Sequence, residues 1–348
     1  MRFKAMQLTC SLAKLAGLRR FSVVVGLLVA LIALSVASLC FGSSEIDLHT
    51  LLDAFVTHDP TSNEHLVVWS LRLPRTMVAI LAGFALGVAG ALTQAVTRNP
   101  LAEPGLLGVN AGAATAVIIG VAVLGLNDIR SYVWLGFAGA AASAFTVLML
   151  GRVGRGGTDP IRLVLAGAGL SIVLGSVTGV IVLNAPTHVL DNFRTWAAGS
   201  VEGRSFEIAG VLGTVATLGF IIAMAISTRL NVIALGEDLG RALGAQAGTT
   251  MIAACGAVTL LAGAATAAAG PITFLGLVAP QLTRSLVGPD CRWIIPVSGL
   301  SGACVLLFSD IIGRLVVAPD EVAAGIVVLL IGGPFFVLSV RHFRLRQV

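Results

Sequence analysis

Charged side chains are scarce in this sequence: Asp, Glu, Lys and Arg together make up 11% of its 348 residues. Soluble domains carry about 25%, so an ordinary soluble fold is excluded. The long apolar runs also lack apolar–polar alternation, which excludes the strands of an outer-membrane barrel. What is present is 57% hydrophobic residues and 41 glycines, and small residues allow membrane helices to approach closely. The composition predicts an all-α polytopic membrane protein.

Lysine is nearly absent, and occurs only at positions 4 and 14. A phosphate-binding P-loop needs a Gly-rich segment that ends in Lys followed by Ser or Thr. The Gly-rich segment GRVGRGGTDP (151–160) contains no lysine and follows no predicted strand. The chain is therefore not expected to be an enzyme or to bind a cofactor. If it takes part in active transport, ATP and Mg²⁺ belong to a separate ATPase subunit.

Metal-binding and disulfide patterns are also missing. The five cysteines are scattered and include no CxxC pair, which indicates neither a metal site nor a disulfide framework. The segment HDPTSNEH (58–65) carries two histidines and two acids, but a hydrophilic loop often produces such a cluster by chance. We therefore expect no metal site in this chain.

The apolar residues form blocks of the length needed to cross about 30 Å of hydrocarbon. A helix through the Gly270-Pro271 junction would extend roughly 55 Å, so a break is predicted there. The first block is too long for a signal peptide and is interpreted as a retained span. Ten spans are predicted in one domain (1–348), with halves at 21–183 and 208–340: 21–41, 76–97, 106–126, 132–150, 161–183, 208–227, 250–269, 271–288, 293–312 and 322–340.

Basic residues orient these spans. Arg and Lys accumulate before the first block and in the C-terminal RHFRLRQV (341–348), so both termini are predicted to be cytoplasmic. Ten crossings satisfy this condition and place most of the 22 basic residues inside. Arg72 and Arg75, in RLPR (72–75), are then predicted to lie outside, with Pro74 in the first turn of a helix. They serve either to anchor the helix end at lipid headgroups or to receive an acidic partner.

Two segments resemble each other within the chain. Residues 81–109 and 256–280 share an AGA-rich helix, a proline break and a following GLLG or LGL. In the predicted topology the first helix runs inward and the second outward. This is the pattern of an inverted repeat, which is frequent in transporters.

A polar inner segment, STRLNVIALGEDLGRALGAQAG (227–248), offers a surface to a partner. Leu235, Leu239 and Leu243 recur every four positions between glycines. Short helices of this kind can fill a groove on another protein, whereas a helix lying on the bilayer would carry more Lys or Arg. We predict that residues 228–249 form a cytoplasmic loop that couples the chain to an ATPase. The spans contain no acid–His relay, so ion-driven transport is the weaker alternative.

Four segments resemble the permeases of bacterial ABC importers for iron–siderophores, haem and cobalamin. The resemblance covers residues 21 to 340, and the sequence of these segments is most similar to permeases of the ferric-enterobactin type. Its segments are RLPRTMVAILAGFALGVAGALTQAVTRNPLAEPGLLGVNAGA (72–113), LGEDLGRALGA (235–245), GPITFLGLVAPQLTR (270–284) and FSDIIGRLVV (308–317).

This resemblance implies a type II importer with two permease subunits, identical or different, two P-loop ATPases and a substrate-binding protein. It implies docking of the binding protein on Arg72, Arg75 and Arg314. It places ATPase coupling on Leu235, Gly236, Glu237, Asp238, Leu239, Gly240, Arg241, Leu243 and Gly244. The implied gate and translocation path comprise Thr158, Asp159, Pro160, Ile161, Ser171, Ser176 and Thr178.

The expected cargo is a ferric siderophore, of the catecholate type, carried across the bacterial cytoplasmic (inner) membrane. Asp159-Pro160 departs from the hydroxyl-rich gate of the cobalamin permeases, which favours a siderophore. The alternatives are a haem or cobalamin permease of the same family, or an ion-coupled secondary transporter. No nucleic-acid partner is expected, because the positive charge flanks the apolar blocks.

Overall fold

The computed structural model describes residues 2–42, 46–57, 59–126, 129–151, 160–236, 240, 242 and 246–345, and these residues contain helices and turns but no strand. The helices that correspond to the ten predicted spans are α1 (Arg2–Cys40), α4 (Leu73–Thr97), α5 (Val109–Ala122), α6 (Ile129–Gly151), α7 (Pro160–Asn184), α9 (Phe206–Ile233), α11 (Ala247–Ala269), α12 (Leu275–Val287), α13 (Cys291–Val316) and α14 (Ala324–Leu345). Shorter helices connect them: α2 (Leu48–Val56), α3 (Asn63–Val67), the π-helix η1 (Val68–Arg72), the 3₁₀-helix η2 (Pro104–Leu107) and α8 (Thr187–Ala197).

Seven helices of the described chain are long and apolar enough to cross a membrane, and Val109–Ala122 and Ala324–Leu338 are shorter apolar helices. The predicted blocks 106–126 and 271–288 are longer than the helices they contain. α5 is shortened by η2 before it, and α12 starts only after the extended segment that follows Gly270. The predicted break at Gly270-Pro271 is confirmed.

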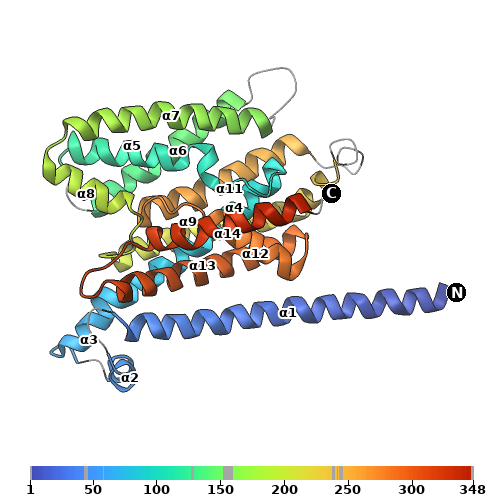
Figure 1. The fold of residues 1–348 in the computed structure, drawn as a ribbon, viewed down its shortest axis with the longest axis horizontal. Helices are drawn as coiled ribbons and strands as arrows, with labels where there is room; N and C mark the ends of the chain where they lie inside the picture. Colours follow the sequence, from blue (N-terminus) through green and yellow to red (C-terminus); the bar gives the residue numbers. More distant parts are fainter. Residues whose placement is uncertain are drawn as a thin grey trace.

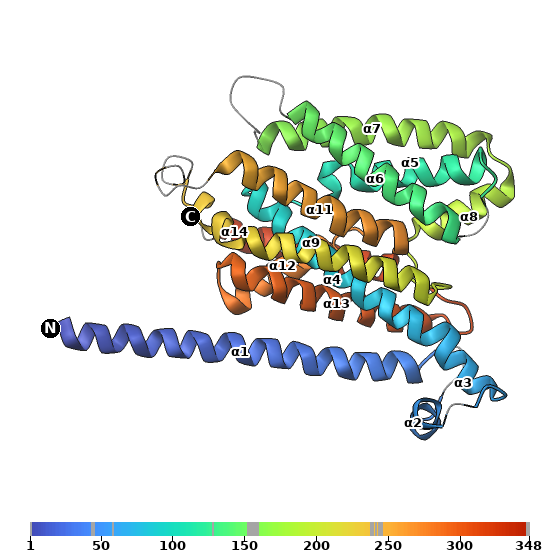
Figure 2. The same cartoon turned by 180° about the vertical axis from the view of Figure 1, so that it is seen from behind.

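The centre of the bundle is formed by α4, α11 and α13, which are mostly buried, whereas α1 and α7 are mostly exposed. Figures 1 and 2 show α1 and α7 on opposite sides of the bundle, with α5 and α6 next to α7. α7 exposes Ile172, Val173, Val180 and Leu183 along its length. An apolar surface of this extent suits a lipid or protein environment.

Glycines bring α4 and α13 into backbone contact. A Cβ on Gly83 would collide with the backbone of Gly302, and one on Gly87 with the carbonyl of Ser298. Membrane helices gain most from such close packing because lipid supplies no hydrophobic force between them. These two helices therefore form a tightly packed pair.

The two similar segments both fold as a helix, a break and a short helix. α4, η2 and α5 form one set, and α11, the break and α12 form the other. The sets run in opposite directions (Figures 1 and 2) and touch where Thr266 Oγ1 donates to Asn110 Oδ1 (2.9 Å). This arrangement agrees with the predicted inverted repeat.

The connections gather at the two ends of the bundle. α2, α3, η1 and α8 lie at one end, whereas the first turn of α7, the last turn of α9 and the first turn of α11 lie at the other (Figure 1). Arg72 and Leu235 therefore occupy opposite ends of the molecule, as the predicted topology requires.

Candidate docking and coupling sites

The docking residue Arg72 is positioned by the segment that leads into α4. Trp69 Nε1 donates to the carbonyl of Ala54 on α2 (2.9 Å), and Pro74 occupies the first turn of α4. The π-helix that ends at Arg72 turns its guanidinium toward the end of α1. There Nη1 donates to the carbonyls of Leu39 (2.7 Å) and Cys40 (2.8 Å). Arg72 is 5% exposed.

Arg75 lies one turn further along α4 and binds two carboxylates. Its Nη2 lies 2.8 Å from Asp310 Oδ1 on α13, and its Nε donates to both oxygens of that carboxylate at 3.1 Å. Its Nη1 donates to Glu321 Oε2 (2.7 Å), just before α14. Hydrogen bonds between two ionised groups are the stronger ones, so this arginine joins three parts of the bundle.

Arg314 shares Asp310 with Arg75. Its Nη2 lies 3.1 Å from Asp310 Oδ2, and it also donates to Ser38 Oγ (2.8 Å) and to the carbonyls of Ser38 (3.0 Å) and Phe41 (2.9 Å). The Asp310 side chain is 1% exposed and that of Arg314 3%. One buried carboxylate thus holds two arginines 239 positions apart in their numbering.

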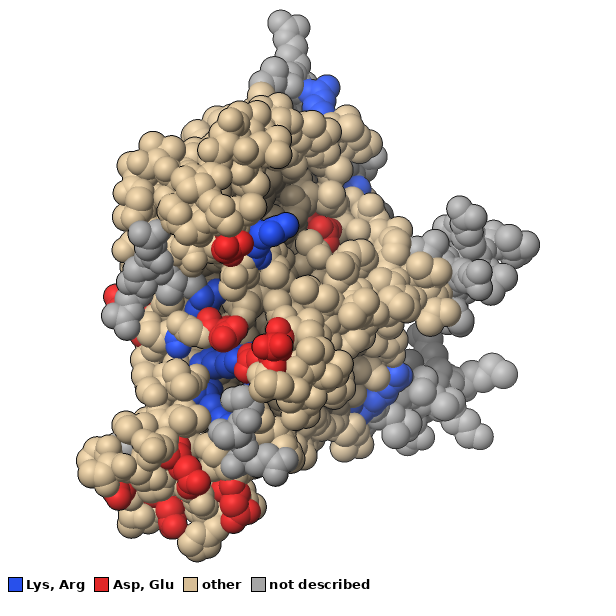
Figure 3. Space-filling model, turned by 60° about the vertical axis from the view of Figure 1, so that its left-hand side comes forward, with Lys and Arg blue, Asp and Glu red and all other residues tan. Residues whose placement is uncertain are grey.

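These arginines surround a cavity of about 260 Å³ that we call the arginine cleft. Figure 3 shows basic and acidic side chains gathered in a hollow near the middle of this face. The cleft is lined by Gly42, Val67, Leu71, Arg72, Arg75, Glu202, Gly203, Arg314 and Glu321. Glu202 and Glu321 are not among the predicted docking residues, although the predicted topology places their loops on the same side as Arg72.

Arg204 is a further arginine near the cleft. It donates from Nη2 to the carbonyl of Ser200 (2.7 Å), while its buried Nε has no hydrogen-bond partner among the residues that the structure describes. Burial is the main cause that lowers the pKa of Arg204 to about 10. The nearby positive charge of Arg75 lowers the pKa of Arg204 further. The concentration of positive charge here therefore disfavours the charged form of Arg204.

The three predicted docking arginines are therefore brought together, but their guanidinium groups are largely buried and bonded within the chain. All three line the arginine cleft. Glu321 is the most accessible of the ion-paired acids there, with a side chain 21% exposed.

At the opposite end, the start of the coupling loop follows α9 directly. Leu235 is 61% exposed, and Gly236 has φ +114°, which a residue with a side chain rarely adopts. Gly240 is buried, and its N–H donates to the carbonyl of Gly236 (2.9 Å). The remaining predicted coupling residues lie outside the described residues: Glu237, Asp238, Leu239, Arg241, Leu243 and Gly244.

The predicted gate falls only partly within the described residues, because Thr158 and Asp159 lie outside them. Pro160 begins α7, and Ile161 after it is 69% exposed. Ser171 is half-buried on α7.

The two other predicted path residues point to different surroundings. Ser176 lies on the exposed side of α7, where its Oγ donates to the carbonyl of Ile172 (2.9 Å). Thr178 instead meets Thr115 of α5, with 3.0 Å between their hydroxyl oxygens. These residues share a helix but are not brought together into one lining by this chain.

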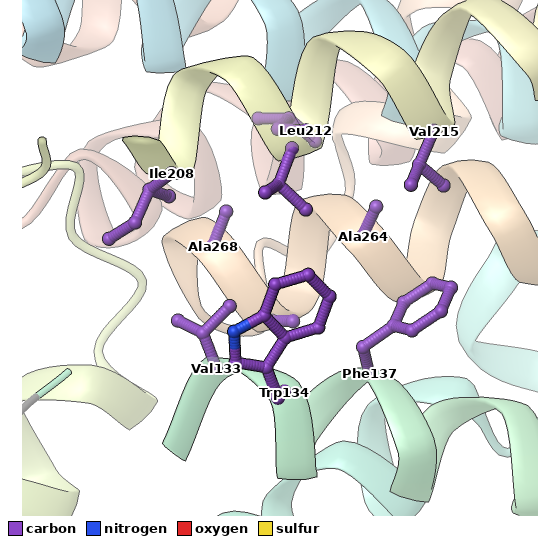
Figure 4. Close-up of a pocket in the computed structure, with 10 residues that line it drawn as sticks. Val133, Trp134, Phe137, Ile208, Leu212, Val215, Ala264 and Ala268 are labelled. Carbon is purple, nitrogen blue, oxygen red and sulfur yellow. The ribbon is translucent and has the colours of Figure 1, made fainter. Parts of the chain in front are cut away.

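A second cavity, of about 20 Å³, lies between α6, α9 and α11 (Figure 4). Trp134, Phe137, Ile208, Leu212 and Val215 are among its apolar lining residues. It holds no more than a water-sized group and is too small for a chelate. Among the described residues there is also no group of three potential metal ligands.

A helical bundle of this kind, with an arginine-lined cleft at one end and the exposed Leu235 at the other, has the construction of a polytopic transport permease. The FecCD transport family matches residues 28–342, and this chain belongs to that family. The match begins within α1 and ends within α14, and it covers the eight other helices that correspond to the predicted spans completely.

Curated relatives extend over nearly the same length. The ferric enterobactin transport system permease protein FepD of Escherichia coli is 41% identical, over 91% of this chain and 94% of the relative. The probable siderophore transport system permease protein YfiZ of Bacillus subtilis is 36% identical, over 93% and 96%. The hemin transport system permease protein HmuU of Yersinia pestis is 32% identical, over 89% and 92%.

A solved structure shares the fold. It is described as an inward-facing conformation of a metal-chelate type ABC transporter, and it superposes with a TM-score of 0.82 at 24% identity. The superposition covers 92% of this chain and 99% of the other.

Proposed function

We propose that this chain is the permease subunit of an ATP-driven importer that carries a ferric siderophore, of the catecholate type, across the bacterial inner membrane. The observation that supports this most is the 41% identity to the ferric enterobactin permease over nine-tenths of both chains. The bundle supplies a path and two contact surfaces, and chemistry on ATP would belong to another subunit.

The proposed assembly contains a second permease, two P-loop ATPases and a substrate-binding protein. The binding protein would dock at the arginine cleft, and an ATPase would contact the loop that starts at Leu235. ATP-driven closure of the ATPases would move this loop and the helices attached to it. The chelate would then pass between the two permeases, along a surface that includes α7.

Docking at the cleft would require an exchange of partners. A carboxylate of the binding protein could replace Glu321 on Arg75, because Glu321 is the more exposed of the two acids that Arg75 binds. A hydrogen bond between a guanidinium group and a carboxylate joins two ionised groups and is stronger than one between neutral groups. The arginines also increase the rate at which an acidic partner arrives.

The cargo is tested by uptake in a strain that lacks this permease. Cells that express the chain should accumulate radiolabelled iron supplied as a ferric catecholate, and this uptake should stop when ATP is depleted. Haem or cobalamin uptake in place of ferric catecholate would support the alternatives suggested by relatives such as HmuU. Uptake that survives ATP depletion but is lost with an uncoupler would indicate a secondary transporter and contradict the proposal.

Docking is tested with the variants Arg75→Glu and Glu321→Gln. Charge reversal at Arg75 should weaken binding of the substrate-binding protein, whereas Glu321→Gln should strengthen it by removing the internal competitor. Co-purification of the ATPase reports whether each variant still folds and assembles. If both variants assemble and bind the substrate-binding protein with unchanged affinity, the proposal that this protein docks at the arginine cleft is wrong.

A further inference from the structure

The last two turns of α9, just before the coupling loop, are tied to the start of α13 by one side chain. Asn231 Nδ2 donates to Asp290 Oδ1 (2.7 Å), and Asn231 Oδ1 accepts the N–H of Cys291 (2.8 Å). Asp290 also caps α13 by accepting the N–H of Arg292 (3.0 Å). The amide of Asn231 therefore binds the side chain of the N-cap residue and the backbone of the first helical residue together.

A second bond attaches the same end of α9 to α4. Arg98, which ends α4 in a left-handed conformation (φ +50°), donates from Nη2 to the carbonyl of Ile233 (3.1 Å). Ile233 is the last residue of α9, and Leu235, which is exposed, follows two residues later at the start of the predicted coupling loop. The base of the loop is thus held by both members of the tightly packed α4–α13 pair.

The opposite end of that pair carries the arginine cleft. Arg75 of α4 and Asp310 of α13 form a buried ion pair there, and backbone contacts at Gly83 and Gly87 join the helices between the two ends. Packed interiors have low compressibility and transmit displacement. A movement imposed on the end of α9 therefore reaches the cleft through α13 and α4.

We propose that Asn231 is a positioning residue for transport: it connects the coupling loop to α13, so that motion of the loop displaces the helix that carries Asp310 and Arg314. This inference rests on the proposed function of the loop. We call the contact of Asn231 with Asp290 and Cys291 the α9–α13 joint.

The chemistry of the joint requires an amide. Asn231 donates to one partner and accepts from the other, which neither alanine nor aspartate can do. Asn231→Asp would place a second carboxylate against Asp290, and like charges repel. Asn231 and Asp290 are only partly buried, so losing the joint should affect coupling more than folding.

The exchange variant Asn231→Asp/Asp290→Asn keeps a hydrogen bond between the two side chains with donor and acceptor reversed. The carboxylate at 231 would accept both from the Cys291 N–H and from the new amide at 290. Asp290 Oδ1 accepts both from Asn231 and from the Arg292 N–H, so the new amide would turn its nitrogen toward residue 231 and its oxygen toward Arg292. Asp290→Asn alone keeps an amide-to-amide bond and should have a small effect.

The experiment uses the complete importer in proteoliposomes with its ATPase and substrate-binding protein. It measures how much radiolabelled ferric catecholate is imported for each ATP hydrolysed. Asn231→Ala and Asn231→Asp should lower this ratio by roughly fivefold or more, the range of ordinary allosteric coupling, while the ATPase remains bound. The exchange variant should recover most of the wild-type ratio.

Thr214→Ala provides the control. Thr214 lies on the exposed side of the same helix, α9, and its Oγ1 donates only within that helix, to the carbonyl of Gly210 (2.8 Å). Its ratio should equal that of the wild type.

Several results would overturn the inference. One is a wild-type ratio of import to ATP hydrolysis in both Asn231→Ala and Asn231→Asp. Another is a lowered ratio in these variants that the exchange variant does not restore. A wild-type complex that hydrolyses ATP without import, or that binds no ATPase, would instead contradict the proposed function. The two failures are therefore distinguishable.

Discussion

At the scale of the residue, Asp310 determines the charge balance of the arginine cleft. It binds Arg75 and Arg314 at 2.8 and 3.1 Å and has almost no contact with solvent. Loss of this carboxylate would leave two buried guanidinium groups facing each other. The cost of such uncompensated charge exceeds the net benefit of forming the pair.

We therefore expect Asp310→Asn to destabilise the protein by about 3–5 kcal/mol, the cost of breaking a buried ion pair. Glu321→Gln should cost less, because Glu321 binds one arginine and its side chain is 21% exposed. Thermal unfolding in detergent measures the difference. Equal melting temperatures for the two variants would contradict this role of Asp310.

Asp290 gives the stability a specific acid dependence. The hydrogen bond from Arg292 is the main cause that lowers the pKa of Asp290 from 3.8 to about 2. The pKa of Asp290 is lower in the folded than in the unfolded state. Ionised Asp290 therefore stabilises the folded protein above pH 3.8, and this contribution is lost as the pH falls toward 2.

Arg292→Ala should return this pKa toward its ordinary value and so reduce the stability above pH 3.8. Unfolding in detergent as a function of pH measures the change. Arg229→Ala, which removes another exposed arginine at the same end of the bundle, should leave the acid dependence as it is in the wild type.

Sequence patterns identify local partners at this scale better than distant ones. The pairing of Asp310 with Arg314 follows from their i, i+4 spacing on one helix. The pairing of Arg75 with Asp310 joins residues 235 positions apart, and no local spacing predicts it. The predicted topology places both at the same end, but the three docking arginines were grouped through the family resemblance, which does not indicate that Arg75 binds Asp310.

At the scale of the element, helix lengths depend on packing as well as on hydropathy. Gly270-Pro271 marks a break because Gly270 adopts φ +79° and the residue before a proline is disfavoured in the helical conformation, and this was predictable. α5 is shorter than its apolar block because Pro104–Leu107 forms a 3₁₀ turn packed beside Gly276 of α12. That contact belongs to the tertiary structure, so the apolar pattern alone does not contain it.

The close contact of α4 with α12 provides a test of this packing. A Cβ on Gly90 would collide with the carbonyl of Gly276, so Gly90→Ala should destabilise by about 1–3 kcal/mol, as overpacking does. Gly210 on α9 has open space around it, and Gly210→Ala should stabilise by ~0.4–1 kcal/mol. Melting temperatures that shift in the same direction for both variants would contradict the close approach.

At the scale of the whole molecule, the two ends of the bundle have different surfaces. The cleft end holds Arg72, Arg75 and Arg314, and the other end exposes Leu235. The apolar pattern and the basic residues together predicted this separation from the sequence. They could not predict how the ends are connected, because Asn231 and Asp290 meet only after α9 and α13 have packed.

The proposed importer requires these ends to face opposite sides of the membrane. Asn63 on α3 and Gln246 before α11 are both exposed and suit single cysteine substitutions in a chain whose five native cysteines are replaced by serine. In intact spheroplasts, an impermeant thiol reagent should label Asn63→Cys but not Gln246→Cys, and permeabilisation should make Gln246→Cys reactive.

The labelling pattern tests orientation separately from cargo. Basic residues in short cytoplasmic loops determine the orientation of membrane helices. The side of the membrane on which Gln246 lies therefore depends on Arg229, Arg241 and their neighbours, and not on which siderophore is carried. Labelling of both cysteines from outside would leave the coupling loop unable to meet a cytoplasmic ATPase. The cleft and the α9–α13 joint would then lose their proposed partners together, whatever chelate the cells take up.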